Sequence, residues 1–169
     1  NLGIIYYDYG EYDKALEYYE KSYLIDSLTN NIIGQAQLLN NIAITYDDFG
    51  NDQKALASYM RSILLASKVK DYYQLAVTYS NLGELYMETG DFISAESCYV
   101  KLRENYILAN SKVGIAESDI LLGNLNYEKG NYDQALKFYF KGLEVVKPLD
   151  LTNDILNAYL GIDAAYYNL

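Results

Sequence analysis

The stretch YMETGDFISAESCY, from Tyr86 to Tyr99, places one glycine between two segments that both have helical periodicity. Closely similar phrases occur as YYDYGEYDKALEYY at residues 6–19 and as NYEKGNYDQALKFY at residues 126–139. Glycine adopts the left-handed backbone conformation that commonly ends a helix, and the polar residue after it can begin the next one. Each phrase therefore predicts two helices joined by a tight turn.

The phrase belongs to a repeat with a period of forty residues, since glycines stand at positions 10, 50, 90 and 130. The same period gives an alanine column (Ala15, Ala55, Ala95, Ala135), a tyrosine column (Tyr19, Tyr59, Tyr99, Tyr139) and a small-residue column (Gly3, Ala43, Gly83, Gly123). Self-similarity at a period of roughly 20–50 residues is typical of stacked-repeat proteins. We expect the small residues to face the alanines and to let the two helices of a repeat approach closely.

The repeats divide the chain into segments of about 1–30, 31–70, 71–110 and 111–149, and 150–169 forms the first helix of a further repeat or a cap. First helices are expected to end before the central glycines, and second helices to span roughly 12–27, 52–69, 92–109 and 132–147. The predicted N-caps are Asp71, Asp91, Ser111, Asn131 with Gln134 in a capping box, and Asp150 or Thr152.

The pattern NLGxxYxxxGxFxxAxxxY, from Asn81 to Tyr99, resembles the tetratricopeptide repeat, whose usual period is about 34 residues. This chain has no tryptophan, and a proline, Pro148, follows only one repeat. The longer repeat is similar to the variant found in cell-polarity adaptors and in bacterial sensor or regulator proteins. The resemblance implies an all-α fold: a right-handed α-solenoid of antiparallel helix pairs, with about four repeats and one extra helix.

Composition argues against several functions. The net charge is −10, whereas a nucleic-acid binder needs a basic surface to neutralise phosphates. The chain has no histidine and one cysteine, and we expect no catalytic residue, metal site or cofactor. Asp47 and Asp48 are adjacent on a helix and point in different directions, so they do not form an opposed catalytic pair. No apolar run approaches the roughly 18 residues of a membrane span, and a cytoplasmic location is expected.

In the tetratricopeptide family the first helix of each repeat lines a concave groove that binds peptides. Carried onto this chain, the resemblance implies a groove lined by residues of the first helices that lie outside the core columns. The candidate lining residues are Gln37, Asn40, Asn41, Ile44, Asp47, Asp48, Asn81, Glu84, Met87, Glu88, Glu117, Asn124, Tyr127 and Glu128. Asn1 has the position of Asn41 and Asn81 in the first repeat. For Tyr7, Tyr127 and Tyr167, contact with a ligand and a structural role both stay open.

Acidic residues recur once per repeat on these helices, as Asp8, Asp48, Glu88 and Glu128, while most lysines and arginines lie on the second helices. The acids either serve a ligand or are inherited from one duplicated unit. The first reading predicts a partner with a basic or amide-rich segment. Asn41 and Asn124 resemble part of the family's clamp for a C-terminal carboxylate, but the clamp's cations are missing, which disfavours such a partner.

The sequence therefore predicts a non-catalytic module that binds a peptide or a partner domain. The alternative is a sensory or regulatory segment of a larger bacterial signalling or transcription-regulator protein. Both interpretations expect the rest of a parent chain as a further partner.

Overall fold

The structure is a computed structural model that describes residues 2–169, and these residues form helices joined by short turns. The helices are α1 (Leu2–Asp8), α2 (Tyr12–Leu28), α3 (Ile32–Asp48), α4 (Asp52–Val69), α5 (Tyr72–Glu88), α6 (Phe92–Leu108), α7 (Lys112–Glu128), α8 (Tyr132–Val146), the 3-10 helix η1 (Lys147–Leu149) and α9 (Thr152–Tyr167). The predicted all-α architecture and the alternation of first and second helices are confirmed.

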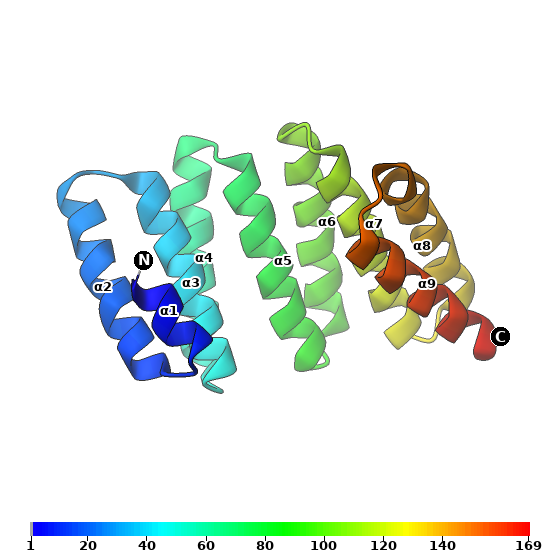
Figure 1. The fold of residues 1–169 in the computed structure, drawn as a ribbon, viewed down its shortest axis with the longest axis horizontal. Helices are drawn as coiled ribbons and strands as arrows, with labels where there is room; N and C mark the ends of the chain where they lie inside the picture. Colours follow the sequence, from blue (N-terminus) through cyan, green and yellow to red (C-terminus); the bar gives the residue numbers. More distant parts are fainter. Residues whose placement is uncertain (1) are drawn as a thin grey trace. The chain divides into compact units, whose positions relative to one another are not determined.

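The chain divides into two compact units, and the division falls inside α5, between Leu85 and Tyr86. In the first unit α2 packs on α1, α3 packs on α2, and α4 packs on α3. In the second unit α6, α7, α8 and α9 pack in the same consecutive order (Figure 1). The repeat boundaries proposed from the sequence stay a prediction.

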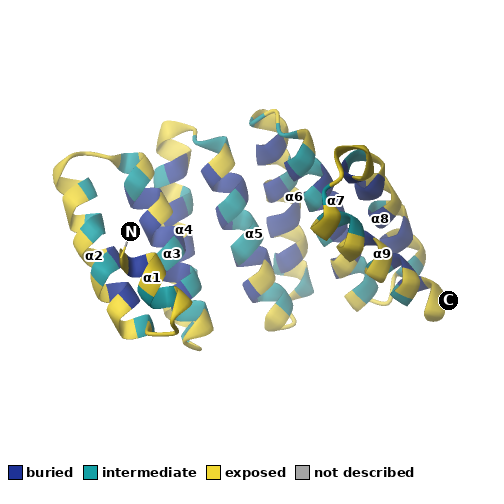
Figure 2. Ribbon diagram, viewed as in Figure 1, coloured by how far each residue is buried: buried dark blue, intermediate teal, exposed yellow. Residues whose placement is uncertain are grey.

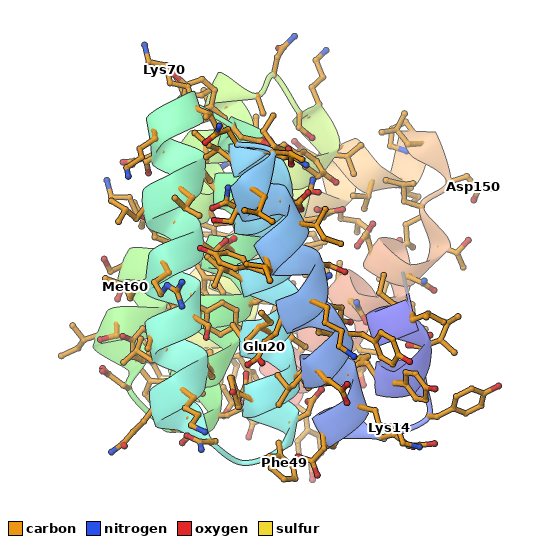
Figure 3. All side chains as sticks on the ribbon, turned by 90° about the vertical axis from the view of Figure 1, so that its left-hand side faces the viewer. Lys14, Glu20, Phe49, Met60, Lys70 and Asp150 are labelled. Carbon is orange, nitrogen blue, oxygen red and sulfur yellow. The ribbon has the colours of Figure 1, made fainter. Side chains whose placement is uncertain are left out.

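The turns inside the repeats are built as the sequence predicts. Gly10, Gly50, Gly90 and Gly130 have φ between +73° and +75°, where a side chain would be strained. A second series was not predicted: the turns between repeats carry the left-handed residues Asn30, Lys70, Asn110 and Asp150, with φ between +53° and +56°. A residue with left-handed backbone conformation therefore occurs every twenty positions, one in each turn, because both kinds of turn reverse the direction of the chain. Figure 3 shows Lys70 at one end of α4 and Phe49 in the turn before its other end.

Most predicted helix caps are present. The side chains of Asp71, Asp91 and Ser111 accept hydrogen bonds from the backbone N–H groups three residues later, at 3.0–3.1 Å. Two expectations were wrong. Asn131 occupies the N-cap position of α8 without a side-chain cap, because the Gln134 N–H bonds to its backbone oxygen instead. The N-cap residue of α9 is Leu151, since Asp150 has the left-handed conformation of the preceding turn.

The alanine and tyrosine columns form the core, and their members are buried between the helices (Figure 2). The reason for the small-residue column differs from the one expected. A Cβ atom added at Gly3 or at Gly123 would lie 2.6 Å from ring carbons of Tyr19 or Tyr139, respectively. The missing side chain makes room for the tyrosine ring of the second helix. Tyr19 and Tyr139 therefore each hold a helix pair together by filling the space above a glycine.

The second unit contains one buried acid, Asp119 on α7, which is 2% exposed. Its Oδ1 accepts hydrogen bonds from Arg103 Nε of α6 at 3.0 Å and from Lys141 Nζ of α8 at 2.8 Å. Lys141, like most lysines and arginines of the chain, lies on a second helix. Its ammonium helps to neutralise a buried carboxylate that joins three consecutive helices.

Candidate functional site

The first unit has a hollow between its first helices, which we call the α1–α3 hollow. It has a volume of ≈ 200 Å³, and the buried Tyr19 of α2 lies at its base. Its other lining residues are Ile4, Tyr7 and Asp8 from α1, with Asn41 and Ile44 from α3. The wall is largely apolar, and the carboxylate of Asp8 is exposed at its edge. Burial, followed by the negative charge of Asp8, raises the pKa of Tyr19.

The second unit has an equivalent, the α7–α9 hollow, with a volume of ≈ 410 Å³. It is lined by Met87 of α5, by Asn124, Tyr127 and Glu128 of α7, by Tyr139 of α8, and by Asn157, Leu160, Gly161 and Ala164 of α9. Six of these residues stand 120 positions after the six that line the α1–α3 hollow. The hollow therefore recurs at equivalent positions in both units, where two successive first helices lie above a buried tyrosine.

The base of the α7–α9 hollow is fixed by a hydrogen bond. The Tyr139 hydroxyl donates to Asn124 Oδ1 at 2.9 Å, and its ring occupies the space left by Gly123 and Gly161. Burial is the main cause that raises the pKa of Tyr139 to about 12. The hydroxyl therefore stays protonated at neutral pH and remains a donor.

Several of the predicted lining residues border these hollows: Asn41, Ile44, Met87, Asn124, Tyr127 and Glu128. Gln37 lies beside a neighbouring opening of ≈ 470 Å³ between α2 and α3. In the second unit the corresponding position is filled, since Ile120 and the Ala116 backbone lie against Gly142 of α8.

Asn40 does not line a groove, and its inclusion was wrong. The residue is 4% exposed, and its Oδ1 accepts a hydrogen bond from Asn81 Nδ2 at 3.1 Å. This bond joins α3 to α5 inside the first unit, so Asn40 holds helices together. Asn81 is half-buried, because one side of its amide is used in the same contact. Asn1 lies outside the described residues.

The acid column is exposed as predicted at Asp8, Asp48, Glu88 and Glu128. One of its members has a partner within the chain, since the Tyr7 hydroxyl donates a hydrogen bond to Asp48 Oδ2. The equivalent residues of the second unit are also hydrogen-bonded, but here the tyrosine accepts: Asn168 Nδ2 donates to the Tyr127 hydroxyl at 3.2 Å. Tyr7 and Tyr127 therefore have a structural role between successive first helices and also line a hollow.

Two further predicted residues carry charge on the same helices. Glu84 is exposed on α5, and Asp47 is half-buried on α3. Glu117 is half-buried on α7, where burial, followed by the charge of Asp154, raises its pKa. Asp154 and Leu160, both on α9, were not predicted, although Leu160 lies in register with Asn40. Asn157 of α9 lies in register with Gln37 and Glu117, which is the position that the repeat predicts for a lining residue.

Cys98 is buried in α6, and burial raises the pKa of its thiol to about 11. A protonated, shielded thiol is a poor nucleophile. Within residues 2–169, no Cys, Asp or Glu side chains gather in threes so that they could hold a metal ion. None of the helices in the described part of the chain combines the length and the apolar character that crossing a membrane requires.

The helix pairs and the hollows between successive first helices define an α-solenoid of repeated helix pairs. A family model described as the tetratricopeptide repeat matches residues 1–68 and 74–147, and the chain belongs to this family. Tetratricopeptide repeats are in general non-catalytic protein–protein interaction modules. No curated protein matches the chain significantly.

Solved structures share the fold at low sequence identity. BtubC (BKLC) from P. vanneervenii is 18% identical and has a TM-score of 0.88, over 99% of this chain and 70% of that chain. A Podosopora anserina protein described as a putative kinesin light chain with nearly identical TPR-like repeats has a TM-score of 0.75 at 15% identity, over 99% of this chain and 83% of that chain. A sequence variant of that protein has the same TM-score at 16% identity, over 99% and 82% of the two chains.

Proposed function

We propose that this chain is a non-catalytic interaction module that binds a basic or amide-rich segment of a partner protein. The binding surface is the first-helix face of each unit, the exposed side of the helices that precede the central glycines. The observation that carries the proposal is the recurrence of the same hollow in both units, at positions 120 residues apart. A hollow between two stacked helices is suited to a side chain of a bound segment, and each unit provides such a hollow.

The chemistry of the hollows supports the kind of partner. Each one has apolar side chains in its lining and an exposed carboxylate at its edge, Asp8 in one unit and Glu128 in the other. The amide of Asn41 lies in the wall of the first hollow, where it can hydrogen-bond a peptide backbone. Acids on a recessed surface attract cationic segments, and added salt should weaken this attraction.

The test is a titration with a basic and an acidic peptide of matched length. Asp48→Lys combined with Glu88→Lys reverses two charges on the first helices. Glu20→Lys combined with Glu144→Lys makes the same change in net charge on exposed positions of the second helices. We expect the basic peptide to lose roughly tenfold in affinity on the first double variant and much less on the control. Preference for the acidic peptide, or equal losses on both double variants, would show that the acids form only a solvated surface.

A further inference from the structure

The forty-residue register gives a third set of residues inside the first unit, equivalent in position to those that line the two hollows. Adding forty to each lining residue of the α1–α3 hollow gives Ile44, Asp47, Asp48, Tyr59, Asn81 and Glu84. All six lie in the unit that ends at Leu85, on α3, α4 and α5. We call this set the α3–α5 site.

The α3–α5 site differs from the two hollows in its charge. Three carboxylates stand where the α1–α3 hollow has Tyr7, Asp8 and Ile44, and no lysine or arginine is among its six residues. The Tyr7 hydroxyl donates to Asp48, which fixes that carboxylate between α1 and α3. Side chains of Asp and Glu within the described residues are not arranged to hold a metal ion, so the chemistry favours an organic cation with a longer reach.

The buried tyrosine of this site has a free hydroxyl. Tyr139 donates to Asn124, fifteen positions earlier in its repeat, but the residue at that distance from Tyr59 is Ile44, which cannot accept a hydrogen bond. Tyr59 is 1% exposed, and none of the described residues accepts from or donates to its hydroxyl. Among the described residues, every side-chain nitrogen or oxygen atom that is fully shielded from solvent has a hydrogen-bond partner. The Tyr59 oxygen therefore keeps some contact with solvent, although the rest of the side chain is buried.

The surroundings of Tyr59 agree with this placement. Burial raises its pKa most, and the negative charges of Asp47, Glu84 and Asp48 raise it further. The three carboxylates are therefore near enough to the hydroxyl for their charges to act on it. A hydroxyl that has no partner in the chain and keeps some access from solvent is available to hydrogen-bond a bound group.

We propose that the α3–α5 site binds one lysine or arginine side chain of the partner segment. The cationic N–H groups donate to the carboxylates of Asp47, Asp48 and Glu84, and one of them donates to the Tyr59 oxygen. The adjacent α1–α3 hollow, with Ile4 and Ile44 in its wall, takes an apolar side chain of the same segment. This inference rests on the proposed function, and it defines a motif of one basic and one apolar residue.

The experiment begins with a random 12-residue peptide library displayed on phage and panned against the whole chain. Enriched peptides are synthesised, and each arginine is replaced in turn by citrulline, which keeps the shape and removes the charge; each lysine is replaced by glutamine. We expect one replacement to weaken binding roughly tenfold or more on the parent chain. On the double variant Glu84→Gln with Asp47→Asn, the same replacement should lower the affinity less than about twofold. The carboxylates that bind the cation are already absent from this variant, so the replacement removes no further interaction.

Tyr59→Phe removes only the hydroxyl, so repeating the replacement on this variant measures the coupling between the hydroxyl and the cation of the peptide. Far-UV circular dichroism checks that the variant is folded. The matched control is Glu20→Gln with Glu144→Gln, which should leave the effect of the replacement unchanged. Binders that need no cation, or a cation whose effect is the same on every variant, would overturn the inference and leave the proposed function standing. A library that gives no binder at all would overturn both.

Discussion

Lys70 shows how strictly the repeat fixes the backbone of single residues. It ends α4 in the left-handed conformation, with φ +56°, where the equivalent residues are two asparagines and one aspartate. Asparagine and aspartate tolerate this conformation better than a lysine side chain does. The repeat therefore demands a left-handed residue here even where the sequence does not supply a favourable one.

We expect Lys70→Gly to raise the free energy of unfolding by about 0.5–1 kcal/mol, because glycine adopts the left-handed conformation without strain. Lys68→Gly is the control, because Lys68 is exposed within the last turn of α4. This change should lower the free energy of unfolding by about 1 kcal/mol, because glycine has a low helix propensity. Urea unfolding monitored by circular dichroism measures both. Destabilisation of the two variants by similar amounts would contradict the assigned conformation.

Cys98 leads to a prediction on pH. Burial, followed by the charge of Asp91, raises its pKa from the ordinary 9.0 to about 11, so the folded state holds the thiol proton more tightly than the unfolded state. The resulting stabilisation is fully present below pH 9 and is lost as the pH rises from 9 to 11. The chain has one cysteine, so mass spectrometry after treatment with iodoacetamide reports this thiol alone. We expect the alkylation rate to rise with a midpoint near 11 in the native protein and near 9 in urea. Rapid native alkylation at neutral pH would refute the burial.

At the scale of helices, a tyrosine ring against a small residue joins the two helices of a repeat. Tyr139 fills the space above Gly123, and a leucine at position 123 would have to displace the ring. We expect Gly123→Leu to lower the free energy of unfolding by about 1–3 kcal/mol or more. Combining it with Tyr139→Ala should cost less than the sum of the two single changes, because the leucine enters the space that the ring vacates. Thermal and urea unfolding of the parent chain, the two single variants and the double variant give a double-mutant cycle. Additive losses would show that the ring is not what the leucine meets.

The helices and their turns could be predicted from the sequence because they depend on local chemistry repeated at a fixed period. Gly90 and Asp91 determine a helix end and a helix start within a few residues. The site was predictable in part. The register places Asn124 and Tyr127 on one helix, where both border the α7–α9 hollow, but the partners of Asn40 and Asp119 lie on neighbouring helices at distances set by packing. Tyr59 was assigned to the core alone, and only the absent partner of its hydroxyl distinguishes it from Tyr139.

At the scale of the whole chain, charge is distributed by helix type. The net charge of −10 is concentrated on the first helices, because cations such as Lys21, Arg61 and Lys141 lie on the second helices and several pair with acids there or in the core. Like charges on one set of helices repel each other, and the repeat tolerates this because each repeat packs mainly on its neighbours. A bound cationic segment would relieve the repulsion, so binding and stability should be linked.

The same nearest-neighbour packing predicts uneven stability along the chain. α1 has 7 residues and buries one of them, Gly3, whereas α7 has 17 residues and contributes Ile120, Leu122 and Leu125 to the buried interior. Local opening is easiest where few apolar contacts are lost, so amides of α1 should exchange with deuterium faster than those of α7. Hydrogen exchange followed by mass spectrometry compares residues 2–8 with residues 112–128. α3 serves as the control, because it has the full 17 residues and lies in the same unit as α1. Equal protection of all three helices would mean that the chain opens only as a whole, which would contradict the view that each repeat is stabilised mainly by its own contacts and its neighbours.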